Sequence, residues 1–412
     1  MGLTNPISYL SDIACRYRYV IVGIFSAGVA IFDSFDKASL QDPFIFAAAG
    51  LRLFSHSWLN VFGDSQIQVG PLQLIYSGII AAISKTTGIG LRLPLSLVTQ
   101  VLFAIGAMLV TRALLRSDDK RSAGAEFATG CIVAIFSIGY RSFTSGQPSD
   151  GFIAAIWVLS AIAARKGHGW IAGALIGASV ALKPWGALGF PLLLLAPNLK
   201  DVIDGALVMT VISAVAYLPF ILFGDFKMFT FRWLFEPHSP LRYLYGSSIG
   251  FTWQDRMIQG AIVSVVGVIA TLKARRSGIA AWAAPLAIVA TKVTLDPVRW
   301  YWYWIPIQLL CLWGTTMIAT RRQEIPWVLA PIAAMALVVV LPSGGLLLGL
   351  LVIAVVMALL FTPLTGSLGA IHAQGALRGS YSQATVRTPE VAMAKGRDKP
   401  KKETKKPKKD KK

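Results

Sequence analysis

Charged residues are scarce in this 412-residue chain: Asp, Glu, Lys and Arg make up 14% of it, whereas hydrophobic residues make up 55%. So little charge excludes an ordinary soluble domain, in which about a quarter of the residues are charged. Cysteines and histidines are also few, three and four respectively. Cys15, Cys131 and Cys311 fall beside or inside apolar runs. We therefore expect neither a disulfide framework nor a metal site built on them.

Apolar sequence, in contrast, is abundant, with a mean hydropathy of +0.61. Runs of membrane-spanning length recur from Tyr19 to Phe361, which predicts an all-α, polytopic transmembrane bundle. The first run lacks a small-residue cleavage site and is interpreted as a retained helix rather than a signal peptide. Several runs are shorter than the ~20 residues of a straight crossing, as is typical of helices that line a cavity. The candidate spans are 19–33, 69–84, 93–115, 126–140, 150–164, 169–182, 184–196, 203–223, 256–272, 278–294, 301–319, 326–341 and 345–362.

Basic residues gather in loops that the positive-inside rule assigns to the cytoplasm, together with both termini. They are Arg16, Arg18, Arg112, Arg116, Lys120, Arg121, Arg165, Lys166, Lys273, Arg275, Arg276, Arg321 and Arg322. The segments expected to face outward are 33–68, 145–149, 183–184, 224–255 and 295–299. For this topology to hold, 69–84 must be a short re-entrant or tilted helix rather than a full crossing. The aromatic-rich segment 226–253 is typical of interfacial helices in the headgroup layer of that outer face.

The C-terminal end is strongly basic and of low complexity. Residues 371–412 hold 13 Lys and Arg against 4 acidic residues, which is +9 of the chain's net charge of +19. Such a composition cannot bury a core. We therefore predict a membrane domain at 1–362 and a disordered, cytoplasmic basic tail at 363–412. The tail is expected to contact anionic membrane lipids rather than nucleic acid, because no aromatic or structured module accompanies its charge.

The first outward segment carries four carboxylates, Asp33, Asp36, Asp42 and Asp64. Asp42 stands out because it precedes Pro43 and opens the helix-like run PFIFAAAGLRLF, where a carboxylate stabilises free backbone N–H groups. That helix would place Phe44, Ala48 and Leu51 on one face, flat on the membrane. Asp42 is therefore our candidate catalytic base; the alternative is a solvated loop carboxylate.

Two later clusters also carry charge at membrane depth. Lys183 lies with Pro184 between two apolar runs, so it must face a cavity, an anion or the aqueous surface. A phosphate near the membrane face would suit it, and snorkelling to the interface is the alternative. Residues 294–304 combine Asp296 and Arg299 with five successive aromatic residues. This run is either an interfacial aromatic belt or the floor of a site that binds phosphate or sugar.

In the order of these clusters, the chain resembles the polyprenyl-phosphate-dependent glycosyltransferases of the GT-C superfamily. The branch it is most similar to holds actinobacterial α-mannosyltransferases and α-arabinofuranosyltransferases. Short motifs over residues 19–320 carry the resemblance: Asp42 with Phe46 and Ala47-Ala48-Ala49, Val69-Gly70-Pro71-Leu72, Gly146-Gln147, the Gly-rich run 172–184 ending in Lys183-Pro184, and Pro297-Val298-Arg299-Trp300. The chain departs from the family in having Pro71 where paired prolines are usual. Trp302 and Tyr303 occupy places that are often histidines.

The resemblance implies transfer of a sugar from a polyprenyl-phosphate donor to a hydroxyl of a lipid-linked or glycan acceptor on the outer face of the plasma membrane. Mannose is the sugar we expect. Asp42 would act as general base, typically for ~10²–10⁴-fold in rate, with inversion at the anomeric carbon. Lys183 and Arg299 would bind the donor phosphate. No cofactor is implied and no metal is required, and metal dependence stays open. The candidate substrate-binding residues are Asp64, Gln147, His238, Asp296, Trp300, Trp302 and Tyr303.

Three alternatives remain open at this point. The sugar could be arabinofuranose or glucose within the same enzyme class. A lipid or solute transporter would typically show repeated halves with broken helices, and the sequence contains no such repeat. A non-catalytic scaffold would account for the missing histidines. A covalent mechanism would need a second carboxylate, for which Asp64 or Asp296 is available.

Overall fold

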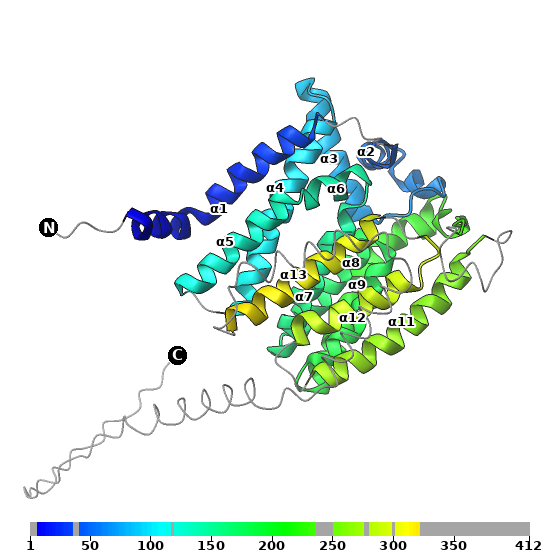
Figure 1. The fold of residues 1–412 in the computed structure, drawn as a ribbon. Coiled ribbons are helices and arrows are strands. Elements are labelled where there is room, and N and C mark those ends of the chain that lie inside the picture. The colour runs from blue at the N-terminus through cyan, green and yellow to red at the C-terminus, as the bar shows by residue number, and fades with distance from the viewer. Residues whose placement is uncertain are drawn as a thin grey trace, which may run out of the picture. The chain divides into compact units, whose positions relative to one another are not determined.

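The computed structural model describes residues 6–35, 41–116, 119–235, 250–275, 280–298 and 301–321, all within the unit Met1–Thr362. These residues form a helical bundle, and among them the isolated bridge Trp233–Phe251 is the sole β pairing (Figure 1). The predicted spans 326–341 and 345–362 and the basic tail lie outside the described residues.

The α-helices are α1 (Pro6–Asp33), α2 (Gln41–Leu53), α3 (Pro71–Thr87), α4 (Arg92–Leu115), α5 (Lys120–Ile135), α6 (Ile138–Thr144), α7 (Pro148–Arg165), α8 (Gly169–Leu182), α9 (Leu199–Phe223), α11 (Trp253–Ala274), α12 (Ala280–Thr294) and α13 (Ile305–Arg321). Shorter 3-10 helices are η1 (Trp58–Gly63), η2 (Pro184–Leu195), η3 (Met228–Thr230) and η4 (Tyr301–Trp304).

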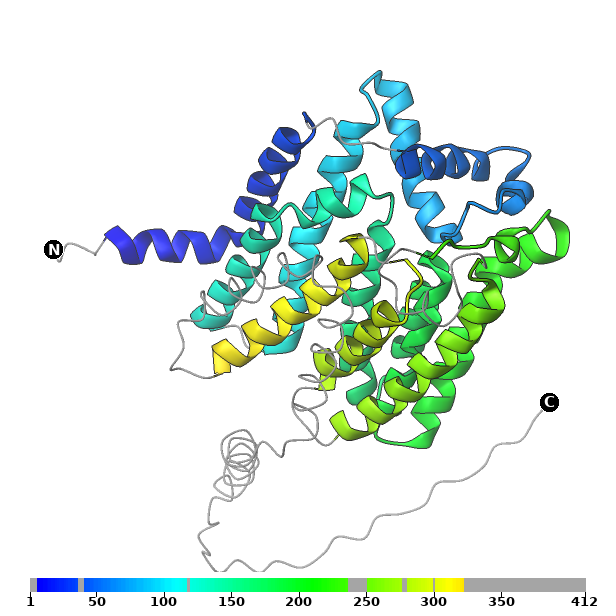
Figure 2. The same ribbon diagram turned by 45° about the vertical axis from the view of Figure 1, so that its right-hand side comes forward.

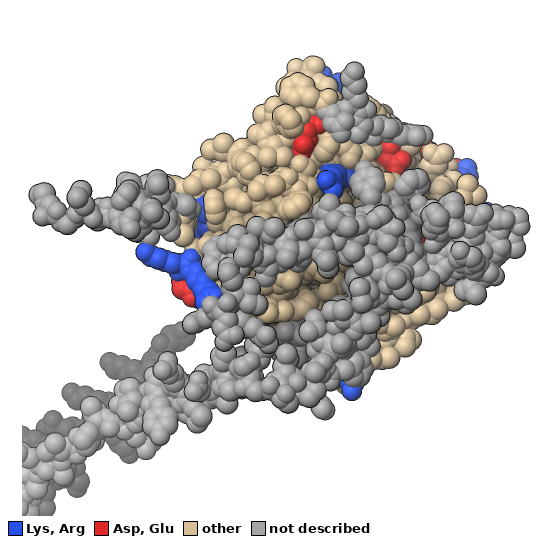
Figure 3. Space-filling view, viewed as in Figure 1, with Lys and Arg blue, Asp and Glu red and all other residues tan. Residues whose placement is uncertain are grey.

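Five helices in the described part are long and apolar enough to cross a membrane: Cys15–Asp33, Arg92–Leu115, Lys120–Thr144, Leu199–Phe223 and Trp253–Ala274. Their outer faces are apolar, as α9 shows with Leu199, Leu207 and Val215 at 72%, 61% and 71% exposure. Charged side chains are sparse on the described surface in Figure 3. An apolar face of this length suits lipid rather than water. The prediction of an all-α polytopic membrane protein is confirmed.

Most helix boundaries agree with the predicted spans, but two predicted spans are divided, and one of them, 301–319, falls into η4 and α13. The run 126–140 is split between α5 and α6 because Ser137 adopts a left-handed backbone conformation, with φ of 50°. The start of α5 also lies six residues earlier, at Lys120. The Asp119 carboxylate accepts a hydrogen bond from the Ser122 backbone N–H at 2.7 Å and so caps the helix.

A hairpin of α8 and η2 carries Lys183 at its tip. The chain reverses at Pro184, which lacks a backbone N–H and cannot continue α8. The returning η2 packs on α8, where the Ser179 hydroxyl donates to the Gly186 carbonyl at 3.1 Å. Beside this hairpin, α9 runs parallel to α8, with the Gly173 backbone touching that of Gly205. The small residues allow this close approach, as expected for the Gly-rich run.

Helix α2 lies across α3 (Figure 2), and this crossing brings Asp42 to the bundle. The two helices meet where Gly50 touches Gly78, and any side chain at either position would strike the other backbone. On the opposite face of α2, Phe44 is 54% exposed and Leu51 is 36% exposed, with Ala48 exposed between them. This is the exposed face that the sequence predicted.

The main hydrophobic core packs α7 against α4, α12 and α13. Its largest members include Trp157 and Trp313, which are almost fully buried. The indole N–H of Trp313 donates to the Ala107 carbonyl at 3.2 Å, so the polar atom of that ring is satisfied inside the core. This packing holds the start of α7 and the end of α12 in fixed positions, and both contribute to the site described next.

Candidate active site

Helix ends converge on one cavity of about 550 Å³. Asp42 lies in the first turn of α2, Gln147 directly precedes α7, and Lys183 directly follows α8. Arg256 lies in the first turn of α11 and Lys292 in the last turn of α12. All five line the cavity. They come from segments predicted to face outward, or from helix turns next to such segments, so the sequence-derived topology placed these groups at one end of the bundle.

Asp42 is held at the cavity wall by close backbone packing. Gly146 has φ of 69°, and a side chain there would lie 2.5 Å from the Asp42 Cβ, so the position accommodates only glycine without displacement. The Gly146 carbonyl accepts a hydrogen bond from the buried Gln73 amide at 2.7 Å. Burial raises the pKa of the Asp42 carboxyl, and the Gln147 amide and the Lys183 charge partly offset that rise.

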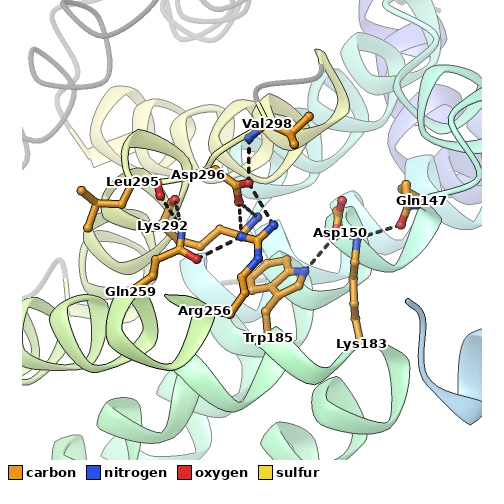
Figure 4. A network of polar contacts seen from close by, with 10 residues as sticks. All are labelled: Gln147, Asp150, Lys183, Trp185, Arg256, Gln259, Lys292, Leu295, Asp296 and Val298. Carbon is orange, nitrogen blue, oxygen red and sulfur yellow. Dashed lines mark hydrogen bonds and ion pairs between the residues drawn. The ribbon is translucent and has the colours of Figure 1, made fainter. Parts of the chain in front are cut away.

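Lys183 lines the same cavity as Asp42, and Figure 4 shows the partners that hold its ammonium group. Its ammonium donates to the Gln147 side-chain oxygen at 2.7 Å and to Asp150 Oδ1 at 2.9 Å. The indole N–H of Trp185 donates to the same Asp150 oxygen at 3.0 Å. Both Lys183 and Asp150 are buried, and Asp150 is fully so. A lysine at this depth therefore has the anionic partner that its burial requires.

A second ion cluster links α11 to the end of α12 through Asp296 (Figure 4). Asp296 accepts two hydrogen bonds from Arg256, at 2.9 and 3.2 Å, and pairs with Lys292 at 2.8 Å. Burial alone would raise the pKa of Asp296, but Arg256 and Lys292 lower it to about 2. Gln259 accepts from Arg256 at 3.0 Å and donates to the Leu295 carbonyl at 2.8 Å. The Arg256 guanidinium is thus fixed in orientation before any ligand binds.

Aromatic rings cover the same cations. The Lys292 ammonium lies 3.9 Å from the Tyr303 ring centroid and 5.2 Å from that of Trp185. The Arg256 guanidinium lies 4.4 Å from the ring centroid of Trp233. These are cation–π contacts, which leave the hydrogen-bonding atoms of a cation free for other partners. Trp233 belongs to the aromatic segment predicted to form interfacial helices. Its described part instead packs ring on ring, as Trp233 on Trp253, and walls the cavity.

The structure brings together most of the predicted site residues that it describes. Asp42, Gln147, Lys183, Trp302 and Tyr303 line the cavity. Asp296 is fully buried and reaches it through its two cationic partners. Asp64 is not among the described lining residues; its carboxylate accepts from the Gln66 backbone N–H at 2.9 Å. His238, Arg299 and Trp300 lie outside the described residues, so their predicted roles stay predictions.

Sequence reasoning missed Arg256, Lys292 and Gln259. A signal was available for the two cations, because each belongs to a predicted span, Arg256 as the first residue of 256–272 and Lys292 near the end of 278–294. An ionisable residue in such a span marks a functional site by default. Lys292 also precedes Asp296 by four residues, a spacing at which opposite charges on one helix face attract. For Gln259 the sequence gives no such signal.

The arrangement presents one carboxylate and three cations to a shared space. Among the described lining residues Asp42 is the single acid, facing Lys183, Arg256 and Lys292. The two partner carboxylates, Asp150 and Asp296, balance two of the three positive charges. Ionised Asp42 balances the third, so an anion would bind here through direct contact with the fixed cations rather than through an excess of positive charge. In the described part of the chain, no three His, Cys, Asp or Glu side chains gather as a protein metal site would require.

Comparisons with known proteins agree with this chemistry. The family model described as Glycosyltransferase family 87 matches residues 71–301, which is more than half of the chain. The matched region includes Gln147, Lys183, Arg256, Lys292 and Asp296, whereas Asp42 lies before it. No curated protein matches the chain.

Proposed function

The chain belongs to glycosyltransferase family 87. From that premise we propose that it transfers a sugar from a polyprenyl-phosphate donor to an acceptor hydroxyl, with mannose as the preferred sugar. The acceptor is a lipid-linked sugar or a glycan. The observation that carries the proposal is the cavity in which one carboxylate faces three cations. Transfer requires a base for the acceptor hydroxyl and positive charge for the departing phosphate, and the two lie on walls of one space.

Asp42 is the proposed general base. It is partly buried in the wall of the cavity, and burial raises its pKa, which makes the carboxylate more basic. A carboxylate so placed takes the hydroxyl proton as the oxygen attacks the anomeric carbon, which contributes typically ~10²–10⁴-fold in rate. The other two carboxylates of the cluster, Asp150 and Asp296, are committed to cations. A direct displacement with inversion follows from this single acid.

Lys183, Arg256 and Lys292 are the proposed ligands of the donor phosphate. A phosphate that joins a polyprenol to a sugar carries one negative charge, and it gains charge as the sugar leaves. Cations already fixed in place stabilise that developing charge without reorganising during the step. Arg256 is preorganised by Asp296 and Gln259, and its fork of N–H groups matches phosphate oxygens.

The apolar side of the cavity supports a lipid-borne donor. Ala187, Leu188, Met257 and Gly260 line this side, and Met257 is 73% exposed on the outer face of α11. Below it, α11 continues with exposed apolar side chains, namely Ile258, Ile262, Val265 and Ile269. A polyprenyl chain can therefore lie against this wall while its phosphate meets the cations. A water-soluble sugar nucleotide would gain nothing from such a wall.

The proposed location is the plasma membrane, with the site on its outer face and both termini in the cytoplasm. The positive-inside distribution of Lys and Arg supports this orientation. The predicted inner segments bear Arg165 and Lys273, which lie in the last turns of α7 and α11. The opposite ends of these two helices carry Gln147 and Arg256, which line the cavity. A lipid-linked donor also suits this face, because sugar nucleotides are made inside the cell.

The decisive test incubates the purified protein with polyprenyl phosphates bearing mannose, arabinofuranose or glucose, together with extracted membrane lipids and glycans as acceptors. Product masses identify the sugar and the acceptor in one experiment. In the mannose arm we expect a product heavier than the acceptor by one anhydrohexose unit, ~162 mass units, which the Asp42→Asn variant should form ~10²–10⁴-fold more slowly. A product in the arabinofuranose or glucose arm alone would replace mannose with that sugar. Transfer from none of the donors would overturn the proposal.

A further inference from the structure

Lys183 stands between two carboxylates but is bonded to just one of them. Its ammonium contacts Asp150 at 2.9 Å and the Gln147 amide oxygen at 2.7 Å. Among the described ion pairs, none joins Lys183 to Asp42, although the Lys183 charge acts on that carboxyl. Gln147 lies between the two groups, because its side chain also contacts Asp42. The lysine is therefore close to the proposed base and held back from it.

Asp150 has no contact with the cavity that would give it a substrate-binding role. It is fully buried in the first turn of α7 and is not among the described lining residues. One of its oxygens binds both Lys183 and the Trp185 indole, and the other is without a partner. A buried carboxylate with an unsatisfied oxygen costs desolvation free energy, and an ion pair such as the one with Lys183 offsets part of that cost. Such a costly group suggests a function for its charge.

We propose that Asp150 is a positioning residue that holds Lys183 away from Asp42, so that Asp42 stays free to accept a proton. This inference rests on the proposed function of Asp42 as the base. The reason is a conflict in the site. A cation near the phosphate aids transfer, but the same cation in direct contact with the base would neutralise it and occupy its oxygens. A second carboxylate behind the lysine resolves this conflict.

The remaining charged groups around Asp42 leave this role to Asp150. Arg256 and Lys292 are tied to Asp296, which shares their charge. Tyr303 is a phenol, so it brings no positive charge that could pair with Asp42. Among the described cations that line the cavity with Asp42, Lys183 is therefore the one that pairs with Asp150, and Asp150 is the sole carboxylate in its described ion pairs. Without that carboxylate, Asp42 is the acid that lines the same cavity as Lys183 and already feels its charge.

The test is a double-mutant cycle read by infrared difference titration of the Asp42 carboxyl, with the Asp42→Asn variant subtracted to assign the band. In Asp150→Asn, which keeps the size and an oxygen acceptor for Trp185, Lys183 should pair with Asp42. A new ion pair lowers a carboxyl pKa by about one unit or more. In the Lys183→Met background the same Asp150→Asn change should leave the Asp42 titration within about 0.3 units, because no ammonium remains to be held.

Equal shifts in both backgrounds would show that Asp150 acts on Asp42 directly, and no shift in either would reduce Asp150 to a packing role. Either result overturns the inference. If Asp150→Asn alone does not fold, Asp150→Glu serves instead. Asp150→Glu keeps the negative charge and should keep Lys183 in place, so the Asp42 carboxyl should titrate as in the wild type. A lower Asp42 pKa in this variant would contradict the proposal.

A parallel transfer assay keeps the two proposals apart. The acid limb of the rate against pH should move down with the infrared titration in Asp150→Asn, and in the double variant it should match the limb of the Lys183→Met single variant. The infrared measurement needs no donor, so a protein without transfer activity would defeat the proposed function while still deciding how Lys183 is held.

Discussion

Two buried ion clusters in this bundle look alike but border different surroundings. In one, Glu126 on α5 accepts from Arg18 at 2.7 Å and from the Tyr19 hydroxyl at 2.9 Å, both on α1. In the other, Asp296 binds Arg256 and Lys292. Each carboxylate is almost fully buried. The difference is that Arg256 and Lys292 lie at helix ends and line the cavity, whereas the lining includes no residue of the Glu126 cluster.

Burial of charge therefore does not by itself mark a functional site. The Glu126 cluster joins the neighbouring helices α1 and α5, as expected for an ion pair that stabilises their packing. The Asp296 cluster aims cations into a space that also holds an acid of raised pKa. Substitutions matched between the two clusters should separate stability from catalysis, and the following predictions use them in that way.

The largest difference should come from the two acids, Asp42 and Glu126. Asp42→Asn removes the base and should lower transfer by about 10²–10⁴-fold. The variant should be no less stable than wild type. Burial raises the Asp42 pKa above its unfolded value, so its ionised form opposes folding at neutral pH. Transfer assays and thermal unfolding in detergent measure the two effects.

Glu126→Gln is the matched change at the other cluster. It leaves Arg18 without its anionic partner and should cost about 2 kcal/mol of stability, while transfer per folded molecule stays at the wild-type rate. A catalytic defect in Glu126→Gln with normal unfolding would remove the distinction between the clusters.

A smaller difference is expected between the cations Lys292 and Arg18. Lys292→Met leaves Arg256 paired with Asp296 and removes one charge from the cavity. It should raise the KM for the polyprenyl-phosphate donor about 10–100-fold, which corresponds to about 1.4–2.8 kcal/mol of lost binding. Arg18→Met should leave the donor KM unchanged. An unchanged KM in Lys292→Met would show that the phosphate binds elsewhere.

The smallest effect is a difference in pH dependence within the site. Transfer needs ionised Asp42, whose pKa burial raises, so activity should fall as pH drops through that raised pKa. Asp296 behaves in the opposite way, since its folded pKa is lowered to about 2. Its stabilising contribution is complete above the unfolded pKa of about 3.9 and is lost as pH falls from there toward 2.

Rate and unfolding measured over the same pH series separate the two groups. The acid limb of the rate should appear while the fold is intact. Coincident loss of rate and fold would attribute the limb to Asp296 or to general unfolding instead of to the base.

The fold and part of the site could be predicted from the sequence. Hydrophobic runs gave the helices, because each span must satisfy its own backbone in lipid. Asp42 and Lys183 were recognisable since each is a charge at the edge of an apolar run. The break at Ser137 was not, because a left-handed serine has no sequence signature of its own.

The tertiary contacts were beyond sequence reasoning for a different reason. Pairing of Arg256 with Asp296 joins residues 40 positions apart, and that of Lys183 with Asp150 joins residues 33 positions apart. Such pairings depend on how α7, α8, α11 and α12 pack, which periodicity does not encode. Gln259 illustrates the limit, because besides its bond to Arg256 on the same helix it donates to the carbonyls of Lys292 and Leu295 on other segments.

The configuration of the product at its anomeric carbon tests the central claim most directly. With a donor of known anomer, proton NMR of the product reports whether that centre is inverted. A single cavity carboxylate acting as base predicts inversion. A retained configuration would require a second nucleophilic group at the sugar and would contradict the account of one acid facing three cations.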